Sequence, residues 1–471
     1  MKRILTRLLF ALPLAVAATA LGAAAQRPNV VFILSDDMGY GDIGVHGCKD
    51  IPTPNIDRIA AGGVLFSDAY ANGSFCTPTR AALMSGRYQH RHGNEDLANV
   101  TGPLPAAVRT LPDRLRAAGY TTGMVGKWHL GDQPGFTPLD RGFGEFFGFL
   151  GGGHQYIISP DGKGEYNAPI LRNRAPVDER RYLTDAFGEE AAAFVKRQHQ
   201  AANPFFLYLA FNAVHTPLQA TEKYLQRFAH IADLRRRTYA AMLSAMDDAI
   251  GRVLTALEQT GKLGDTLVIF HNDNGGAVNN GSRNTPWRGF KIDTWEGGIR
   301  VPLAMQWPGM LPPGAVYRQP VITMDLTATV LAAATAEAAG VEGINLLPFV
   351  RGDKSGAPHD ALFWRCRTET ADNCYAVRRG DWIFVHTHRY SEDGTGRGPA
   401  IAPERLYNLA VDPGERHDLA AAEPAKLAEL KQLFAVWSAA VDADCRQIGI
   451  EPKTPAATSA KQAKTKKNPG R

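Results

Sequence analysis

The sequence contains little cysteine and, beyond its first residues, no long apolar run. Five cysteines occur among 471 residues, and they form no cluster with histidine of the kind that binds zinc. After residue 25, no segment is long and apolar enough to span a bilayer, so we expect no stable membrane association. The composition, with 44% hydrophobic residues, instead suits a large globular core.

A strong excess of charge of either sign is also absent. The net charge is +5, but three basic residues near the N-terminus and six near the C-terminus contribute more than this excess, so the remaining body is mildly acidic. The sequence therefore indicates no surface for nucleic acid. A charged substrate would have to be attracted by local groups in a pocket rather than by the net charge.

The two ends of the chain differ from its body. Residues 1–25 have a basic start, an apolar run and small residues before Gln26, which is the pattern of a secretory signal peptide. We therefore predict export to the periplasm or the extracellular space, with the export machinery as a partner. Residues 451–471 are rich in Lys, Ala, Thr and Pro, and we predict a disordered basic tail there.

The few cysteines leave their pairing open. In an oxidising compartment, Cys366 and Cys374 could form a disulfide across a short loop, and Cys48 could pair with Cys445. Free thiols are the alternative for all four.

Apolar runs alternate with segments of helical spacing through most of the chain. Strands are predicted at 29–34, 64–70, 120–125, 205–210 and 266–270, and helices at 53–63, 111–118, 184–199 and 239–257. This alternation predicts an α/β fold, a mostly parallel sheet sandwiched by helices. Asp247 and Asp248 lie on the last of these helices, and we expect them on its solvated face rather than in a metal site.

Two regions depart from this alternation. Residues 135–181 show no sustained period, and we predict long loops over the mouth of a site. After residue 351, three short strands precede an amphipathic helix, which predicts a smaller α+β subdomain with an antiparallel sheet. The expected domains are a catalytic domain at 27–355 and a C-terminal subdomain at 356–450.

Polar and charged side chains follow the ends of several predicted strands. Because the carboxyl ends of parallel strands meet at one edge of a sheet, we expect these side chains to converge. They are Asp36, Asp37, Lys127, His129, His215, Asp273, Asn274 and Lys291. Three carboxylates and an amide oxygen make a hard, all-oxygen site that suits Ca²⁺, or Mg²⁺ if the cage is tighter.

A cysteine joins this set from a short helical stretch. Cys76 precedes Pro78, which fits the first turn of a helix, and Gly86 can end that helix. Free N–H groups at a helix N-terminus favour an anion, and Arg80 lies about one turn further on. The stretch therefore predicts an anion bound against a sulfur-bearing residue, with a structural cysteine as the alternative.

The sequence from Ser74 to Arg87, SFCTPTRAALMSGR, resembles the signature of the type I sulfatases of the alkaline phosphatase superfamily. The other strand-end motifs also fit, with Asp-Asn-Gly at 273–275 where many relatives have Asp-His-Gly. The resemblance implies an alkaline phosphatase-like fold and a sulfuric ester hydrolase. It also implies a maturation enzyme that converts Cys76 to Cα-formylglycine, whose hydrate is the nucleophile.

The resemblance further implies a role for each site residue. Ca²⁺ would be bound by Asp36, Asp37, Asp273 and Asn274, and it would also contact residue 76 (Cys76 in its modified form). Lys127 and Lys291 would stabilise charge on the sulfate group, with Arg80 holding the hydrate. Asp273 would assist the attack, His215 and Lys291 would protonate or stabilise the leaving alcohol, and His129 would take a proton to release sulfate. Catalytic or substrate-binding roles thus fall on Cys76, Arg80, Lys127, His129, His215 and Lys291.

The substrate is less well defined by the sequence. Export and loops rich in Gly, Trp and His favour a sulfated carbohydrate, such as a 6-sulfated hexosamine. The further substrate contacts that we predict are His154, Gln155, Arg283, Trp287 and Arg288. A phosphonate monoester or phosphodiester hydrolase of the same superfamily, and an inactive protein that binds sulfated glycan, are the alternative functions.

Overall fold

The computed structural model describes residues 27–96, 101–159, 166–366, 374–387 and 403–452. The predicted signal peptide and nearly all of the predicted basic tail lie outside these residues. Within the described ranges, none of the helices combines the length and the apolar character needed to cross a bilayer.

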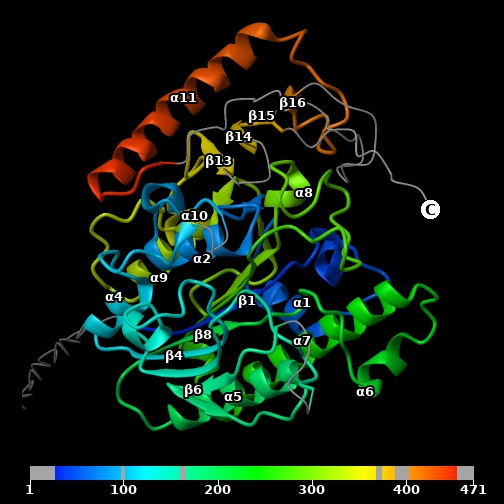
Figure 1. Cartoon of the computed structure of the whole chain (residues 1–471), viewed down its shortest axis with the longest axis vertical. Coiled ribbons are helices and arrows are strands. Elements are labelled where there is room, and N and C mark those ends of the chain that lie inside the picture. Colours follow the sequence, from blue (N-terminus) through cyan, green and yellow to red (C-terminus); the bar gives the residue numbers. More distant parts are fainter. Residues whose placement is uncertain (1–26, 97–100, 160–165, 367–373, 388–402, 453–471) are drawn as a thin grey trace, which may run out of the picture.

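A large sheet forms the centre of the molecule, as predicted (Figure 1). Its inner strands are parallel from β9 through β1, β8 and β4 to β5, and antiparallel strands flank them. In sheet order the strands are β11 (Ala315–Tyr317), β2 (Val64–Phe66), β10 (Leu303–Gln306), β9 (Thr266–Asn272), β1 (Asn29–Ser35), β8 (Phe205–Ala210), β4 (Thr121–Lys127), β5 (Glu145–Phe149), β6 (Ile170–Arg172) and β7 (Ala175–Val177).

Helices cover both faces of this sheet because its central strands are apolar on both faces. In β1, Val31 and Ile33 pack on one side, whereas Phe32 and Leu34 pack on the other. The first face is covered by α1 (Pro54–Ala61), α5 (Leu183–Arg197), α6 (Glu222–Leu225) and α7 (Leu234–Gln259). The second is covered by α2 (Cys76–Ser85), α4 (Leu111–Ala117), α9 (Thr323–Ala333) and α10 (Leu347–Val350).

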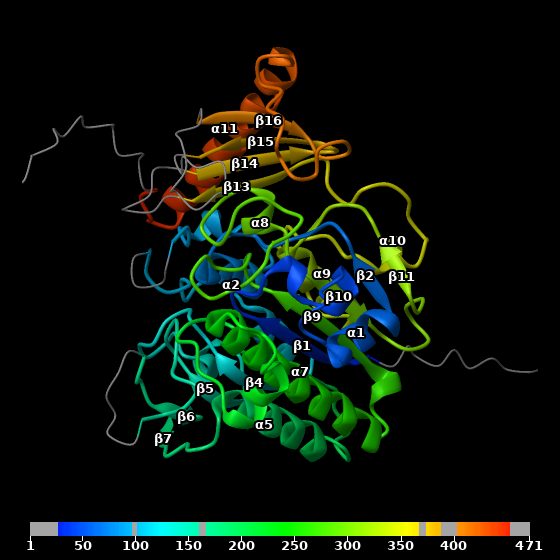
Figure 2. The same ribbon diagram turned by 90° about the vertical axis from the view of Figure 1, so that its right-hand side faces the viewer.

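A second sheet lies at one end of the molecule with α11 (Pro424–Gln447) against it (Figure 2). Its four strands are all antiparallel, as predicted for the C-terminal region. They are β13 (Leu362–Cys366), β14 (Cys374–Arg379), β15 (Trp382–His386) and β16 (Glu404–Asn408). The domain boundary between 355 and 356 stays a prediction.

Three local expectations were wrong. The segment 64–70 is two strands, because β3 (Ala69–Tyr70) leaves the large sheet to pair with β12 (Val321–Ile322). The segment 135–181 contains β5, β6 and β7 rather than loops alone. Asp247 is not on a solvated face: it is buried, and its carboxylate accepts the backbone N–H groups of Asn55 and Ile56 in the first turn of α1.

Two of the cysteine predictions can be placed in this fold. The register of β13 and β14 sets Cys366 directly opposite Cys374, so the predicted disulfide between them is compatible with the strand pairing and stays a prediction. Cys48 and Cys445 are both free thiols. The Cys48 thiol contacts Asp50, and the Cys445 thiol donates to the carbonyl of His90, so the alternative pairing of these two is not formed.

Candidate active site

Four parallel strands carry the predicted polar residues to one edge of the large sheet. Asp36 and Asp37 follow β1, Asp273 and Asn274 follow β9, and the β4 strand ends at Lys127. The end of β8 leads through a short turn to His215. Parallel pairing of β9, β1, β8 and β4 aligns their carboxyl ends at one edge of the sheet. The predicted convergence of the polar side chains that follow these strands is therefore found.

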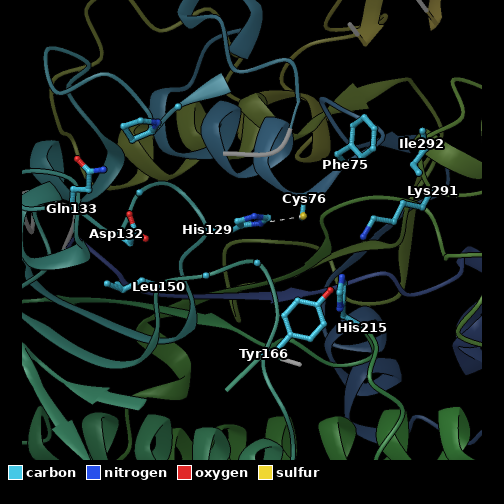
Figure 3. A pocket seen from close by; sticks show the side chains of 15 residues that line it. Phe75, Cys76, His129, Asp132, Gln133, Leu150, Tyr166, His215, Lys291 and Ile292 are labelled. Atoms are coloured by element: carbon cyan, nitrogen blue, oxygen red, sulfur yellow. Dashed lines mark hydrogen bonds between the residues drawn. The ribbon is translucent and has the colours of Figure 1, made fainter. Parts of the chain in front are cut away.

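Cys76 reaches this edge from the N-terminus of α2. It is the first residue of the helix rather than the residue before it, and Phe75 is the N-cap. Gly86 ends the helix in the left-handed conformation, as its lack of a side chain permits. The Cys76 thiol lies 3.2 Å from Nδ1 of His129, and Figure 3 shows the His129 ring pointing towards it.

The three carboxylates each contact a cation. The Arg80 guanidinium donates from Nε and Nη2 to Oδ2 of Asp273 at 3.0 and 2.9 Å. The Lys127 ammonium donates to Asp36, and the Lys291 ammonium lies 2.7 Å from Oδ1 of Asp37. These contacts are almost completely buried. The charges of the six groups balance, so burying them together is tolerable.

Neighbouring charges set the ionisation of these groups. Burial alone would raise the pKa of Asp36, but the Lys127 ammonium outweighs this and the pKa is lowered. For Asp37, Lys291 outweighs burial in the same way, and the pKa falls well below its usual range. Burial and the nearby charge of Asp36 raise the pKa of Asp273 well above its ordinary value.

His129 is held in its neutral form. Burial and the positive charge of Lys127 lower its pKa well below that of a free histidine. A neutral imidazole can accept a proton, so His129 is suited to act as a base beside residue 76. His129 and Asp37 also have positive φ angles of 60° and 57°, a conformation in which strain is commonly found at functional sites.

Two buried oxygens at this edge fit a hard cation. Oδ1 of Asp36 and Oδ1 of Asn274 have no hydrogen-bond partner among the described residues. Unpaired buried acceptors are costly, and a cation removes the cost. Asp36, Asp37 and His215 also offer ligand atoms within 4.8 Å of one another. The donor set of carboxylate and amide oxygens is that of a Ca²⁺ or Mg²⁺ site.

A cavity of about 700 Å³ opens onto Cys76. His129, His215 and Lys291 line it together with residues that we did not predict. Tyr166 stands beside His215, with 6.1 Å between the ring centroids, and Asp132 and Gln133 lie beyond His129 (Figure 3). Phe75 and Ile292 form another part of the wall and pack against Cys366 and Cys374 of the second sheet.

The five further contacts predicted for substrate are not brought to this cavity. His154 is buried, with its ring nitrogens on the carbonyls of Gln155 and Ala168, and it lines a separate small cavity together with Gln155. The Arg283 guanidinium is half exposed and binds Asp50 at 2.9 Å.

The other two of these five residues pack on side chains outside the cavity. Trp287 stacks with Arg300, whose guanidinium carbon lies 3.9 Å from the ring centroid. Arg288 lies over Trp295 and donates to the carbonyl of Glu415.

Two asparagines that we did not predict hold the loops of the site in place through hydrogen bonds to backbone carbonyls. The Asn280 amide donates to the carbonyls of Asp37 and Val214, and the Asn272 amide donates to the carbonyl of Met38. Both side chains are fully buried. Asn272 lies next to Asp273 at the end of β9, and this position was a signal that could have identified it.

Comparison with known proteins agrees with this geometry. The family model described as Sulfatase matches residues 28–336, and the model described as N-sulphoglucosamine sulphohydrolase, C-terminal, matches residues 291–435. Human N-acetylgalactosamine-6-sulfatase is 35% identical over 452 residues, which cover 84% of this chain and 82% of the human protein. Human arylsulfatase A is 34% identical over 456 residues, which cover 87% of this chain and 88% of that protein.

A solved structure described as Ps i-CgsB in complex with k-i-k-neocarrahexaose is similar over 91% of this chain and 96% of its own. Its TM-score is 0.82 and its sequence identity is 35%. The family match spans more than half of the chain, and relatives of this identity span most of it. The chain therefore belongs to the sulfatase family and is a sulfuric ester hydrolase.

Proposed function

We propose that this sulfatase hydrolyses sulfate monoesters of carbohydrates, with Cys76 matured to Cα-formylglycine and Ca²⁺ bound at the sheet edge. The observation that carries the proposal is the position of residue 76, which lines the cavity, lies at a helix N-terminus, and is 3.2 Å from Nδ1 of His129. A maturation enzyme in the host and export to the periplasm or the extracellular space belong to the same proposal.

Asp36, Asp37, Asp273 and Asn274 would hold the metal ion. The ion would supply positive charge beside the sulfate group, and the unpaired oxygens of Asp36 and Asn274 support its binding there. The three carboxylates already balance Arg80, Lys127 and Lys291, so a divalent ion would leave the site with an excess of positive charge. Such an excess suits an anionic substrate.

Formylglycine hydrate would supply a geminal diol, which can both attack sulfur and later release sulfate by reforming the aldehyde. The chain's own residues would then orient and move protons. His129 would take a proton from residue 76 at Nδ1, the atom that faces it. Arg80 would fix Asp273 through two hydrogen bonds and keep its carboxylate beside residue 76.

Lys291 and His215 would face the leaving alcohol. Both line the cavity, and both contact Asp37, at 2.7 Å from the Lys291 ammonium and 3.7 Å from Nε2 of His215. Donors fixed in this way can stabilise the departing oxygen in the transition state without reorganising, an effect worth roughly 3–4 kcal/mol per donor in comparable sites. Lys127, whose ammonium donates to Asp36, would add to this stabilisation.

A sugar is the substrate class that the cavity and the relatives support. About 700 Å³ is far more than a sulfate group requires. The relatives named above include a sulfatase of N-acetylgalactosamine 6-sulfate and a structure that holds neocarrahexaose. We therefore propose a sulfated hexose or hexosamine unit, with a 6-sulfated hexosamine as the first compound to try.

The test is sulfate release from a panel of sulfated glycans and aryl sulfate, with an aryl phosphodiester alongside and residue 76 checked by mass spectrometry. We expect an aldehyde mass at residue 76 and faster hydrolysis of sulfate esters than of the phosphodiester. Dominant phosphodiester turnover would favour the phosphodiesterase alternative. An intact aldehyde with no turnover of any ester would favour an inactive glycan-binding protein.

A further inference from the structure

A second cavity, of about 480 Å³, lies away from the site around Cys76. It is bounded by the end of α2, by the short helix η3 (Gln89–His92), by α4 and by the C-terminal end of α11. In Figure 1 this end of α11 lies on the same side of the molecule as α2 and α4. The cavity shares no lining residue with the cavity at Cys76.

Basic side chains from two stretches of the chain, 87–92 and 109–114, line this second cavity. Its basic lining residues are Arg87, Arg91, His92, Arg109 and Arg114. Three carboxylates, Glu337, Glu342 and Asp444, pair with the four arginines. The cluster therefore has one more guanidinium than carboxylate. Burial and the charges of Arg87 and Arg91 lower the pKa of His92 to about 4, which reflects the positive surroundings.

Three buried nitrogens of the cluster lack a hydrogen-bond partner among the described residues, and one of them, Nε of Arg87, still lies 3.5 Å from Glu342. The other two, Nε of Arg114 and Nε2 of His92, have no hydrogen-bond acceptor or donor within the described ranges, and the two residues are only 8% and 5% exposed. The guanidinium Nε–H is always a donor, and the imidazole nitrogen is a donor in one tautomer. Leaving such a group unpaired is unfavourable, because it has lost its hydrogen bonds to water. The described carboxylates and carbonyls therefore do not use all of the donors in this cluster.

We propose that this cavity is a second anion-binding site that takes a sulfate-type oxyanion. Four guanidinium groups and an unpaired donor around one cavity match a tetrahedral anion with several acceptor oxygens. In a sulfatase, the anion can be a sulfate ester on a glycan chain or the free sulfate ion that the reaction releases. The proposal does not depend on the chemistry at Cys76, since it concerns binding alone.

Binding is measured in the full chain carrying Cys76→Ala, so that no probe is hydrolysed. The probes are radiolabelled inorganic sulfate in equilibrium dialysis and dextran sulfate in a titration. The variant is Arg87→Gln with Arg109→Gln, whose side chains are 34% and 46% exposed, so that folding is preserved. The matched control is Arg116→Gln, an exposed residue on the same helix as Arg114 that does not line the cavity.

We expect the double variant to bind at least one of the probes tenfold or more weakly than the control. A loss for dextran sulfate alone identifies a glycan sulfate as the ligand, and a loss for inorganic sulfate alone identifies the free ion. Equal binding of both probes by the double variant and the control would overturn the proposal. If the double variant is unstable, Arg109→Gln alone is measured instead, and it too should bind at least one probe tenfold or more weakly than the control.

A second readout separates this proposal from the one for the catalytic site. With Cys76 intact, the double variant should hydrolyse a small aryl sulfate with a kcat/KM within twofold of the control. Failure of turnover in every protein, with the binding difference preserved, would count against the catalytic proposal only.

Discussion

Two nitrogens of the Arg80 guanidinium, Nε and Nη2, donate to one oxygen of Asp273, Oδ2, at 3.0 and 2.9 Å, and neither side chain is exposed to solvent. The helix that begins at Cys76 is thereby attached to the strand end that carries a candidate metal ligand. One pair of hydrogen bonds thus fixes the distance between the nucleophile position and the metal position.

Replacing Arg80 should damage both stability and activity. In Arg80→Gln, the Asp273 carboxylate is left buried without its partner, which should lower the free energy of unfolding by about 3–5 kcal/mol. Activity on aryl sulfate should fall at least a hundredfold. Adding Asp273→Asn should recover part of the thermal stability, measured by differential scanning fluorimetry, but none of the activity. Full activity in either variant would contradict this role of the pair.

Replacing Cys76 should separate chemistry from folding. Cys76→Ser is nearly isosteric, so the melting temperature should stay within a few degrees of the parent protein. Turnover of aryl sulfate should fall to background, because a serine hydroxyl has no second hydroxyl through which sulfate can be released. Peptide mass spectrometry of both proteins is the control. Brisk turnover by a protein with an unaltered cysteine at position 76 would refute the mechanism.

Removing divalent ions should abolish activity and lower the melting temperature. A ligand that binds the folded state alone stabilises it by roughly 2.7 kcal/mol at a hundred times its dissociation constant. Dialysis against a chelator and titration with Ca²⁺ should therefore give a reversible thermal shift. In Asn274→Ala, which loses one of the unpaired oxygens, this shift should require a higher Ca²⁺ concentration. An equal shift in both proteins would place the ion elsewhere.

Tyr166 should act on binding of sugars rather than on sulfate chemistry. Its ring lies in the cavity wall beside His215 and has no contact with Cys76 among the interactions of the described residues. Tyr166→Ala should raise the KM for a sulfated sugar about tenfold. The loss of ring stacking costs roughly 0.5–1.5 kcal/mol, and the loss of the apolar area that the ring buries against the sugar adds to this cost. The kcat/KM for a small aryl sulfate should change less than threefold, and Tyr166→Phe should behave as the parent. A parallel loss on both substrates would contradict this role.

The buried Asp247 should make stability depend on pH. Burial raises its pKa to about 6, whereas the unfolded value is 3.8. The folded state therefore binds the proton more tightly, and the contribution of this group is greatest below pH 3.8 and is lost as the pH rises through 6. The loss between pH 4 and pH 7 is about 2 kcal/mol.

Asp247→Asn keeps an oxygen that can accept the N–H groups of α1 but cannot ionise. The melting temperature of Asp247→Asn relative to the parent should therefore rise as the pH is raised from 4 to 7. Asp248→Asn, on the more exposed neighbour that binds Arg227, is the matched control and should show little of this trend. A pH-independent difference for Asp247→Asn would count against a neutral, buried carboxyl.

Residues whose positions depend on strand order were predictable from the sequence. Asp36, Lys127, His215 and Asp273 each follow a short apolar run, and parallel pairing brings such positions together whatever the detail of the loops. The N-terminus of α2 was marked by Pro78, and its end by Gly86. Local patterns therefore identified both the sheet edge and the helix that faces it.

Residues in long loops were not predictable, because the path of a loop decides whether its side chains face the cavity. Trp287 and Arg288 lie close in sequence to Lys291, but their side chains pack on Arg300 and Trp295 instead of entering the cavity. Tyr166 does line it, from the segment 135–181 that shows no period, and Asp132 lines it from the loop after β4. Asp247 was assigned to solvent because helical spacing alone does not reveal that the N-terminus of α1 lies against it.

The wall formed by Phe75 and Ile292 has a further consequence for protein engineering. Both side chains rest on Cys366 and Cys374, which belong to β13 and β14 of the second sheet. A truncated protein that ended near residue 355 would keep every candidate ligand and proton donor, yet it would lose the support beneath the two residues adjoining Cys76 and Lys291. We therefore expect a protein without the C-terminal sheet to lose activity even though it keeps all of these candidate site residues.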